Sequence, residues 1–364
     1  MLFCISANAQ SFNNPIKGDI NEDGVVNAAD VITLVNIIIN GEKPVYGERF
    51  SELSSRPECL ENPNKRVHED PTPYLSMYWM VEDYSESLEN FRTTYSEFVY
   101  PSLDNYPPQF EKSYIPSIEG LYDLNISGSG EFSPSNIEDV INRIRVYHEG
   151  AIAVVDLRSE THGYLNKMAV YPWSLRSWCN IGKTSEDIVK EERNILRSLE
   201  GDDLYVHQTA KDSMLWSIST TLTEEELCNQ YGLTYKRIAS LDYAFPSDDV
   251  IEDFVNYIRC LPKNVWLHFH CKRGKGRTVL FMSFYDMMRN PTVPLKDIVY
   301  RQYLIGGPST SFLLNDGSNE TVEWKKEFLI EKSTLTPVFY DYVQAHWRDN
   351  FSVSFSQWKA ATYK

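Results

Sequence analysis

The chain has 364 residues, 42% of them hydrophobic and 24% charged, and its formal net charge at pH 7 is −16. This composition is typical of a soluble globular protein, and the length suffices for one large domain or two smaller ones. The acidic balance argues against nucleic acid or an anionic membrane as a partner, since like charges repel. No run of eighteen apolar residues is present, which argues against a transmembrane span.

Residues 1–9 resemble the end of a signal peptide. They are apolar and then small, and the tripeptide at 7–9 fits the small-x-small cleavage pattern, although no basic segment precedes it. We therefore expect a secreted or periplasmic protein. The six cysteines are scattered without a CxxC pair, so neither a zinc site nor a disulfide-dense scaffold is indicated; a disulfide that includes Cys59 stays open.

Residues 16–41 contain a calcium-loop pattern followed by a short apolar helix. Oxygen donors occupy loop positions 1, 3, 5, 7, 9 and 12, with Gly24 at position 6. The alternative is an acidic, solvated loop. The expected ligands are Asp19, Asn21, Asp23, the Val25 carbonyl, Asn27 and Asp30. The segment resembles one dockerin type I repeat, which implies structural calcium remote from catalysis and a cohesin-like or other partner; full dockerins carry two repeats.

Residues 42–75 read as a linker, and residues 76–364 have the composition of an α/β domain. Apolar runs predict strands, and helical spacing with N-terminal capping signals predicts helices. The expected strands are 151–157, 234–240 and 265–270, and the expected helices are 137–147, 184–198, 223–231, 247–261 and 276–289. Their alternation predicts a central, mostly parallel sheet flanked by helices.

The loop 241–246 lies between an expected strand and an expected helix and holds Asp242. An acid on a mobile loop beside a reaction centre can protonate a leaving group. The alternative is an aspartate in an ordinary turn before a proline. Asp248 and Asp249 begin the next helix and are less well placed to reach a site.

Residues 268–278, HFHCKRGKGRT, hold a cysteine and an arginine separated by five residues, between a strand and a helix. Gly274 and Gly276 allow the backbone to turn its N–H groups inward, and the helix N-terminus adds positive potential. That field favours the thiolate of Cys271, and Arg277 can hold two phosphate oxygens. Thr278 can donate its hydroxyl to the sulfur, and we expect His270 to fix the loop by hydrogen bonds.

The neighbourhood of this loop reverses the acidic balance, because residues 263–301 hold eight basic and two acidic residues. Lys272, Arg273 and Lys275 supply cations for an anionic substrate beyond the Arg277 clamp. The alternatives are a buried cysteine in an ordinary strand-to-helix turn, and a sulfur-transfer enzyme, which needs no separate general acid.

Together these residues resemble the protein-tyrosine-phosphatase-like phytases, also called cysteine phytases or inositol polyphosphatases. The resemblance begins near Phe91 and rests on the segments 156–163 (DLRSETHG), 232–246, 266–278 and 296–307. It implies a cysteine-phosphatase fold with a small accessory β region. It also implies stepwise removal of phosphates from inositol hexakisphosphate, with no cofactor for catalysis.

Carried over by position, Cys271 is the nucleophile, Arg277 the phosphate clamp and Asp242 the acid. Further positions match the family's substrate-binding residues. They are Arg92, Asp156 and His207, with Lys325 and Lys326 more loosely aligned. The family usually has a histidine after the general acid, where this chain has Tyr243. The resemblance therefore leaves open which phosphate of the substrate is attacked first.

The leading hypothesis is therefore an inositol-polyphosphate phosphatase. The alternatives are a protein-tyrosine or dual-specificity phosphatase with the same chemistry and another pocket, and a non-catalytic binder of phosphorylated ligands. Intact Cys271, Arg277 and Asp242 argue against the binder, which would be free to lose them.

Overall fold

The computed structural model describes residues 78–82, 88–102, 110–112, 114–174, 177–209, 212–262, 264–308 and 323–363, with only the backbone at 323–327 and 330. The expected signal-peptide remnant, calcium repeat and linker at residues 1–75 lie outside this range. Within it, no helix combines the length and apolar character needed to cross a membrane.

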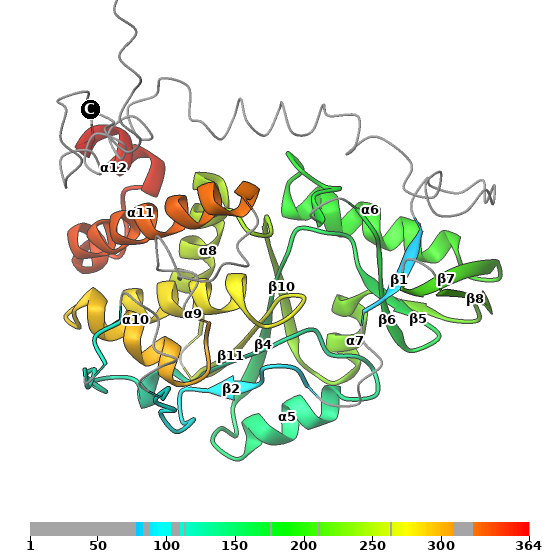
Figure 1. The fold of residues 1–364 in the computed structure, drawn as a ribbon, viewed down its shortest axis with the longest axis horizontal. Helices are drawn as coiled ribbons and strands as arrows, with labels where there is room; N and C mark the ends of the chain where they lie inside the picture. Colours follow the sequence, from blue (N-terminus) through cyan, green and yellow to red (C-terminus); the bar gives the residue numbers. More distant parts are fainter. Residues whose placement is uncertain are drawn as a thin grey trace, which may run out of the picture.

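A five-stranded sheet in the order β10-β4-β11-β3-β2 forms the centre of the molecule (Figure 1). The first four strands run parallel, and β2 pairs antiparallel with β3 at one edge. The strands are β2 Arg92–Thr93, β3 Ile126–Ser129, β4 Ala151–Arg158, β10 Thr234–Ser240 and β11 Val265–His270. This is the mostly parallel sheet that the alternation of strands and helices predicts.

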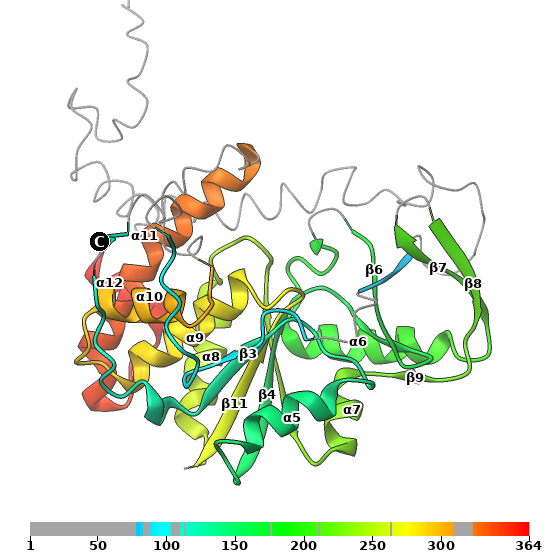
Figure 2. The same cartoon turned by 60° about the horizontal axis from the view of Figure 1, so that its bottom comes forward.

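The helices of the described chain follow one another from α5 to α12. They are α5 Ile137–Arg145, α6 Ser185–Ser198, α7 Glu224–Gln230, α8 Asp248–Cys260, α9 Gly276–Arg289, α10 Leu295–Leu304, α11 Glu323–His346 and α12 Phe355–Thr362, with short 3₁₀ helices at Tyr122–Leu124 and Trp347–Asp349. Figures 1 and 2 show α5 on one side of the sheet and α8, α9, α10 and α11 on the other.

Successive side chains of β4 enter different cores, because they point to opposite faces of the sheet. Ile152 and Val154 pack with α5 and α7 on one face. Ala153 and Val155 pack with α8, α9 and the C-terminal helices on the other face. The sheet is therefore covered by helices on both sides, as a parallel sheet requires.

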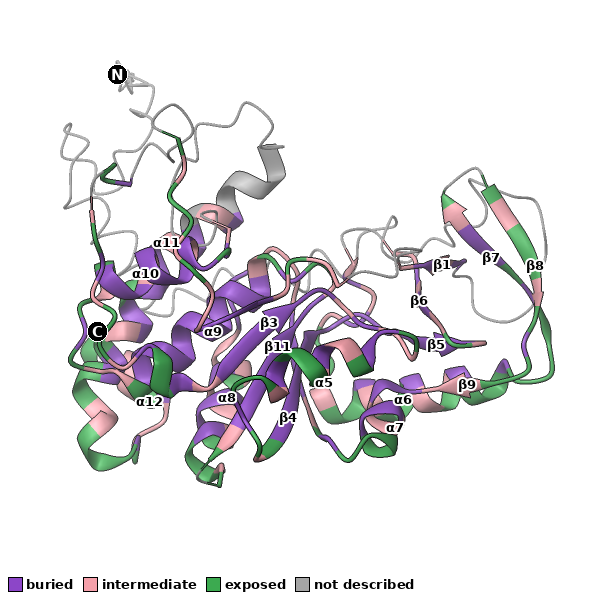
Figure 3. Cartoon of the chain, turned by 90° about the horizontal axis from the view of Figure 1, so that it is seen from below, coloured by how far each residue is buried: buried purple, intermediate pink, exposed green. Residues whose placement is uncertain are grey.

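Helix α9 is buried almost throughout, from Arg277 to Met288 (Figure 3). It lies between the central sheet and helices α10 and α11, so apolar residues are present on all its sides. Such a helix is held rigidly by packing, which fixes the loop that precedes it.

A second, six-stranded sheet in the order β8-β7-β1-β6-β5-β9 lies beside the first and is the accessory β region (Figure 1). Most of its pairs are antiparallel, with β1 and β7 parallel. Its apolar face packs on Leu196 and Leu199 at the end of α6. The strands are β1 Trp79–Val81, β5 Gly163–Leu165, β6 Met168–Pro172, β7 Asp203–Thr209, β8 Asp212–Ser217 and β9 Thr221–Leu222.

Candidate active site

The loop between β11 and α9 surrounds Cys271, whose side chain is buried. Thr278 donates its hydroxyl to the Cys271 sulfur over 3.2 Å, as the sequence predicts. Gly274 has φ +67°, and a Cβ there would lie 2.3 Å from the carbonyl carbon of Ser129. Only glycine fits both the conformation and the space, so the turn depends on it. Gly276 is different, because a Cβ there would meet nothing nearer than the Lys332 ammonium nitrogen at 4.0 Å.

Arg277 is held in a fixed orientation by Glu160 from the loop after β4. Its Nη1 and Nη2 donate to the two carboxylate oxygens over 2.6 and 2.9 Å, and Nη1 also donates to the Ser240 carbonyl over 3.2 Å. Burial lowers the pKa of Arg277, but Asp242 and Glu160 outweigh burial and raise that pKa well above its ordinary value. The guanidinium is therefore a permanent, oriented cation beside Cys271.

Asp242 approaches the same guanidinium from the loop after β10. Its Oδ1 lies 3.4 Å from Arg277 Nε, and its side chain is 25% exposed, in contrast to the buried Arg277. The loop is anchored by Trp178, whose indole N–H donates to the Asp242 carbonyl over 3.0 Å. Tyr243 has φ 67°, a left-handed conformation that is rare for a bulky residue and common at functional loops.

Arg92, at the start of β2, supports the loop around Cys271 from the edge of the sheet. Its Nη1 donates to the Gly274 carbonyl over 2.7 Å, while Nε and Nη2 are buried without a hydrogen-bond partner among the described residues. Burial lowers the pKa of Arg92 to about 10, with the Cys271 thiol group acting in the opposite direction. Two donor atoms thus remain for an anion at this position.

The other cations of the loop diverge in direction. Lys272 places its Nζ 3.3 Å from the Tyr171 ring centroid and 3.6 Å from a Glu82 oxygen, so it joins the loop to the second sheet. Arg273 pairs with Glu89 over 2.8 Å at the surface, and Lys275 is exposed.

Lys332 on α11 is a site residue that the sequence analysis missed. Its side chain is buried, and its Nζ lies near Gly276 at the start of α9. Burial lowers the pKa of Lys332 to about 8, although Asp242 and Glu331 raise it. No motif marks this lysine, but it stands two helical turns after Lys325 and so on the same face of α11. The side chains of Lys325 and Lys326 lie outside the described residues.

Three predicted residues lie deeper than the loop. Asp156 is fully buried and accepts hydrogen bonds from Arg237 Nη1 and the Tyr235 hydroxyl, both over 2.6 Å. His207 on β7 is buried against the Tyr78 ring, with centroids 4.7 Å apart. His270, expected to fix the loop by hydrogen bonds, has no hydrogen-bond partner among the described residues and instead forms an ion-pair contact with the Glu224 carboxylate.

Asp156 belongs to a buried network of charges beneath the loop around Cys271. Its members come from β4, β10, β11, α6, α7 and α9 and from the residues that follow β1, β3 and β4, and they form ion pairs with one another. They are Glu82, Glu131, Asp156, Arg158, Glu160, His162, Glu192, Glu224, Arg237, His270 and Arg277. Burial and Arg158 lower the pKa of His162, but Asp156 and Glu192 raise it to about 9.

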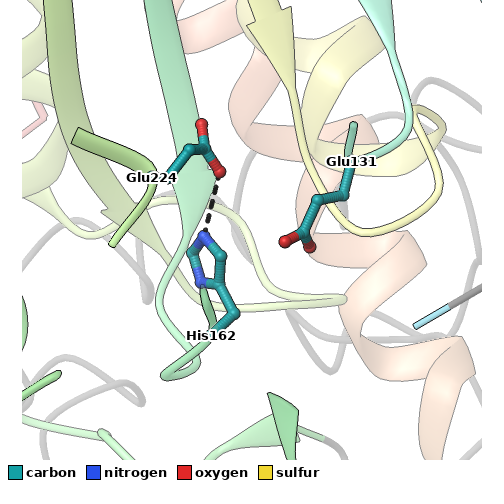
Figure 4. Close-up of side chains that lie close together, drawn as sticks. All are labelled: Glu131, His162 and Glu224. Atoms are coloured by element: carbon teal, nitrogen blue, oxygen red, sulfur yellow. Dashed lines mark hydrogen bonds and ion pairs between the residues drawn. The ribbon is translucent and has the colours of Figure 1, made fainter. Parts of the chain in front are cut away.

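Two trios in this network have ligand-type atoms within 4.8 Å of one another: Glu131, His162 and Glu224 (Figure 4), and Asp156, Glu224 and His270. Arg237 already contacts Asp156 at 2.6 Å and His162 at 3.1 Å. A dication would have to sit beside this guanidinium, so the network is better described as ion pairs than as a metal centre.

The comparisons with known proteins agree with this geometry. The family model of the protein-tyrosine-phosphatase-like phytases, whose description is inositol hexakisphosphate, matches residues 155–289. The tandemly repeated phytase of this type from Mitsuokella multacida is 34% identical, with a TM-score of 0.73, over 87% of this chain and 54% of that one. The fold is therefore that of the protein-tyrosine-phosphatase-like phytases.

Other matches cover different shares of their chains. A myo-inositol phosphatase of this type from Mitsuokella multacida, solved in complex with myo-inositol-(1,3,4,5)-tetrakisphosphate, is 33% identical with a TM-score of 0.72, over 86% of this chain and 54% of that one. A phytase of this type from Bdellovibrio bacteriovorus is 27% identical, with a TM-score of 0.59, over 79% of this chain and 96% of that one. The effector protein hopD2 of Pseudomonas syringae pv. tomato is 26% identical over 66% of this chain and 52% of its own length. The chain thus spans about half the length of several of these relatives.

Proposed function

We propose that this protein is a cysteine-dependent phosphatase that removes phosphates stepwise from myo-inositol hexakisphosphate and lower inositol phosphates. The observation that carries the proposal is an oriented guanidinium, Arg277, beside Cys271, with a partly exposed acid, Asp242, whose Oδ1 lies 3.4 Å from Arg277 Nε. The relative solved with an inositol tetrakisphosphate supports the substrate class.

The chemistry proceeds in two steps. The Cys271 thiolate attacks phosphorus, an S–P bond forms, and the P–O bond to the inositol breaks while Asp242 gives its proton to the leaving oxygen. Asp242, now a carboxylate, then takes a proton from water as the water attacks phosphorus and releases phosphate from sulfur. Arg277 and the loop N–H groups hold the phosphoryl oxygens throughout.

The surrounding cations favour a substrate with several phosphates. Arg92 and Lys332 are buried next to the loop, so each can bind a phosphate away from bulk water. A phosphotyrosine offers one phosphate and an aromatic ring, and it leaves such cations without a phosphate to bind.

The test compares phosphate release from inositol hexakisphosphate and from a phosphotyrosine peptide, with product isomers resolved. We expect the inositol phosphate to be the better substrate and Cys271→Ser to lose at least about a thousandfold in turnover, because a serine hydroxyl is a poor nucleophile here. A preference for the peptide would reassign the protein to the protein phosphatases.

We further propose that residues 16–41 bind structural calcium as a dockerin-like repeat and that the protein is exported to the periplasm or secreted. The support is the spacing of the oxygen donors from Asp19 to Asp30 and the small-x-small pattern at 7–9. Calorimetry with calcium on the full chain tests the first point, with Asp19→Ala as the variant that should lose the binding heat. Cell fractionation tests the second.

A further inference from the structure

Helix α7 directs a carboxylate into the centre of the protein. Its capping box, formed by Thr223 and Glu226, fixes the first turn, and Glu224 is the first residue of the helix. Leu227 and Cys228, three and four positions later, pack on the α5 face of the central sheet. Glu224 therefore points at the same face and is fully buried.

The strand register brings two polar residues to that face. His270, the last residue of β11, is paired with Asp156 of β4, and both project away from the core that contains Cys271. Glu224 Oε1 lies 2.7 Å from His270 Nε2, and Asp156 lies farther away, at 3.8 Å. The other Glu224 oxygen lies 3.2 Å from His162 Nε2 (Figure 4).

His270 directly precedes Cys271, so the orientation of its ring and backbone sets where the nucleophile stands. Neither of its ring nitrogens has a hydrogen-bond partner among the described residues, and the Phe132 ring packs against it with centroids 5.3 Å apart. The contact with Glu224 is thus the main polar restraint that the described residues place on this ring.

We propose that Glu224 is a positioning residue, which acts through His270 to hold Cys271 ready for attack without touching the substrate. The proposal rests on the proposed function, since it assumes that Cys271 is the nucleophile. Burial raises the pKa of Glu224, but His270 and His162 outweigh burial and lower it, so the carboxylate stays charged.

The charged and titratable groups around the pair come from every element packed on it. Those facing Glu224 are Glu131, Asp156, His162, Tyr164, Cys228, Tyr235, Arg237, His268 and His270. Those facing Cys271 are Arg92, Arg277 and Lys332, and the Thr278 hydroxyl donates to its sulfur. The negative charge of Glu224 repels a negative charge on the Cys271 sulfur. If charge alone mattered, removing that charge in Glu224→Gln should make Cys271 more reactive. A positioning role predicts the opposite, and the sign of the effect separates the two.

The test is Glu224→Gln, with Glu225→Gln as the matched control. Glu225 stands next to Glu224 in the same helical turn, but its side chain is 37% exposed and pairs with Arg193. The alkylation rate of Cys271 by iodoacetate is measured against pH by peptide mass spectrometry, with the exposed Cys260 as internal reference. Turnover of an aryl phosphate gives kcat and KM.

We expect Glu224→Gln to slow alkylation of Cys271 and to lower kcat roughly ten- to hundredfold with KM little changed, as small displacements of reacting groups do. Glu225→Gln should match wild type, and Glu224→Asp, which keeps the charge, should recover part of the rate. Alkylation as fast as in the control, or faster, would overturn the proposal.

If Glu224→Gln does not fold, Glu224→Asp decides: a loss of Cys271 reactivity relative to Cys260 supports the proposal, and a wild-type rate overturns it. A failure of the proposed function looks different. In that case wild type and Cys271→Ser would both lack phosphatase activity, whatever the alkylation rates.

Discussion

At the scale of single residues, the strongest constraint on the catalytic loop is Gly274. Alanine there would be strained at φ +67° and would clash with the Ser129 backbone. We expect Gly274→Ala to reduce kcat on any phosphate ester by roughly a hundredfold. Gly232→Ala is the control, because Gly232 has φ +69° with no atom within 4 Å of the added Cβ. Steady-state kinetics on both variants should show a loss only at Gly274; equal activity would mean that the loop tolerates a displaced backbone.

Asp242 can be tested through the leaving group. Asp242→Asn should slow hydrolysis of inositol phosphates roughly a hundred- to ten-thousandfold, because an alkoxide needs a proton to leave. An aryl phosphate with an activated leaving group should be affected much less. Asp249→Asn, an exposed acid at the start of α8, should leave both reactions unchanged.

The comparison is made in kcat/KM across pH with both substrates, because kcat/KM reports only formation of the phosphocysteine, whereas kcat also contains its hydrolysis. Equal losses on the two would mean that Asp242 only positions its loop, and the proton donor would have to be sought among the remaining acids.

At the scale of elements, the buried ionic network joins β4, β10, α6 and α7, and His162 carries its pH dependence. Because the pKa of His162 is raised from 6.5 to about 9 in the folded protein, its stabilisation is complete below pH 6.5 and is lost as pH rises through 9. The change over this window is up to about 3 kcal/mol. Urea denaturation at several pH values measures it.

His162→Gln should flatten this dependence, whereas His346→Gln, outside the network, should keep it. The same slope in His162→Gln as in wild type would assign the effect to other groups.

The sequence predicted the elements that carry clear local signals. Strand β11 and helix α9 were placed residue for residue, because an alternating apolar run ends at a glycine-rich loop. The capping box at Thr223 located α7. The second sheet came only from the family resemblance, since β5 and β9 have three and two residues and no periodicity to detect. Helices α11 and α12 were not predicted.

The site residues that are close together in the sequence could be predicted from one motif. Those that come from distant elements could not. Cys271, Arg277 and Thr278 are close in sequence, so their spacing fixed their contacts. Glu160 and Glu224 were not singled out as site residues, because nothing in the sequence marks a carboxylate as buried and paired. Their partners come from distant elements, which only the fold brings together.

At the scale of the whole molecule, the two sheets meet at the catalytic loop, where Lys272 contacts Tyr171 of β6. All groups in the proposed reaction are side chains and backbone of this chain. We therefore expect turnover in the full-length protein to be unchanged by EDTA, measured as phosphate release before and after dialysis against chelator. Loss of activity restored by a divalent cation would contradict a metal-independent cysteine mechanism.

The central claim is that a phosphoryl group passes through the Cys271 sulfur. The most direct measurement is acid quenching during turnover of inositol hexakisphosphate, followed by mass spectrometry of the peptide that contains Cys271. The account predicts a phosphoryl group on this sulfur in wild type and none in Cys271→Ser. In Asp242→Asn it predicts a larger phosphorylated fraction when the substrate is an activated aryl phosphate, which forms the intermediate without the acid while hydrolysis of the intermediate is slowed. Turnover with no phosphoryl group on Cys271 in either wild type or Asp242→Asn, or sustained turnover by Cys271→Ser, would contradict it.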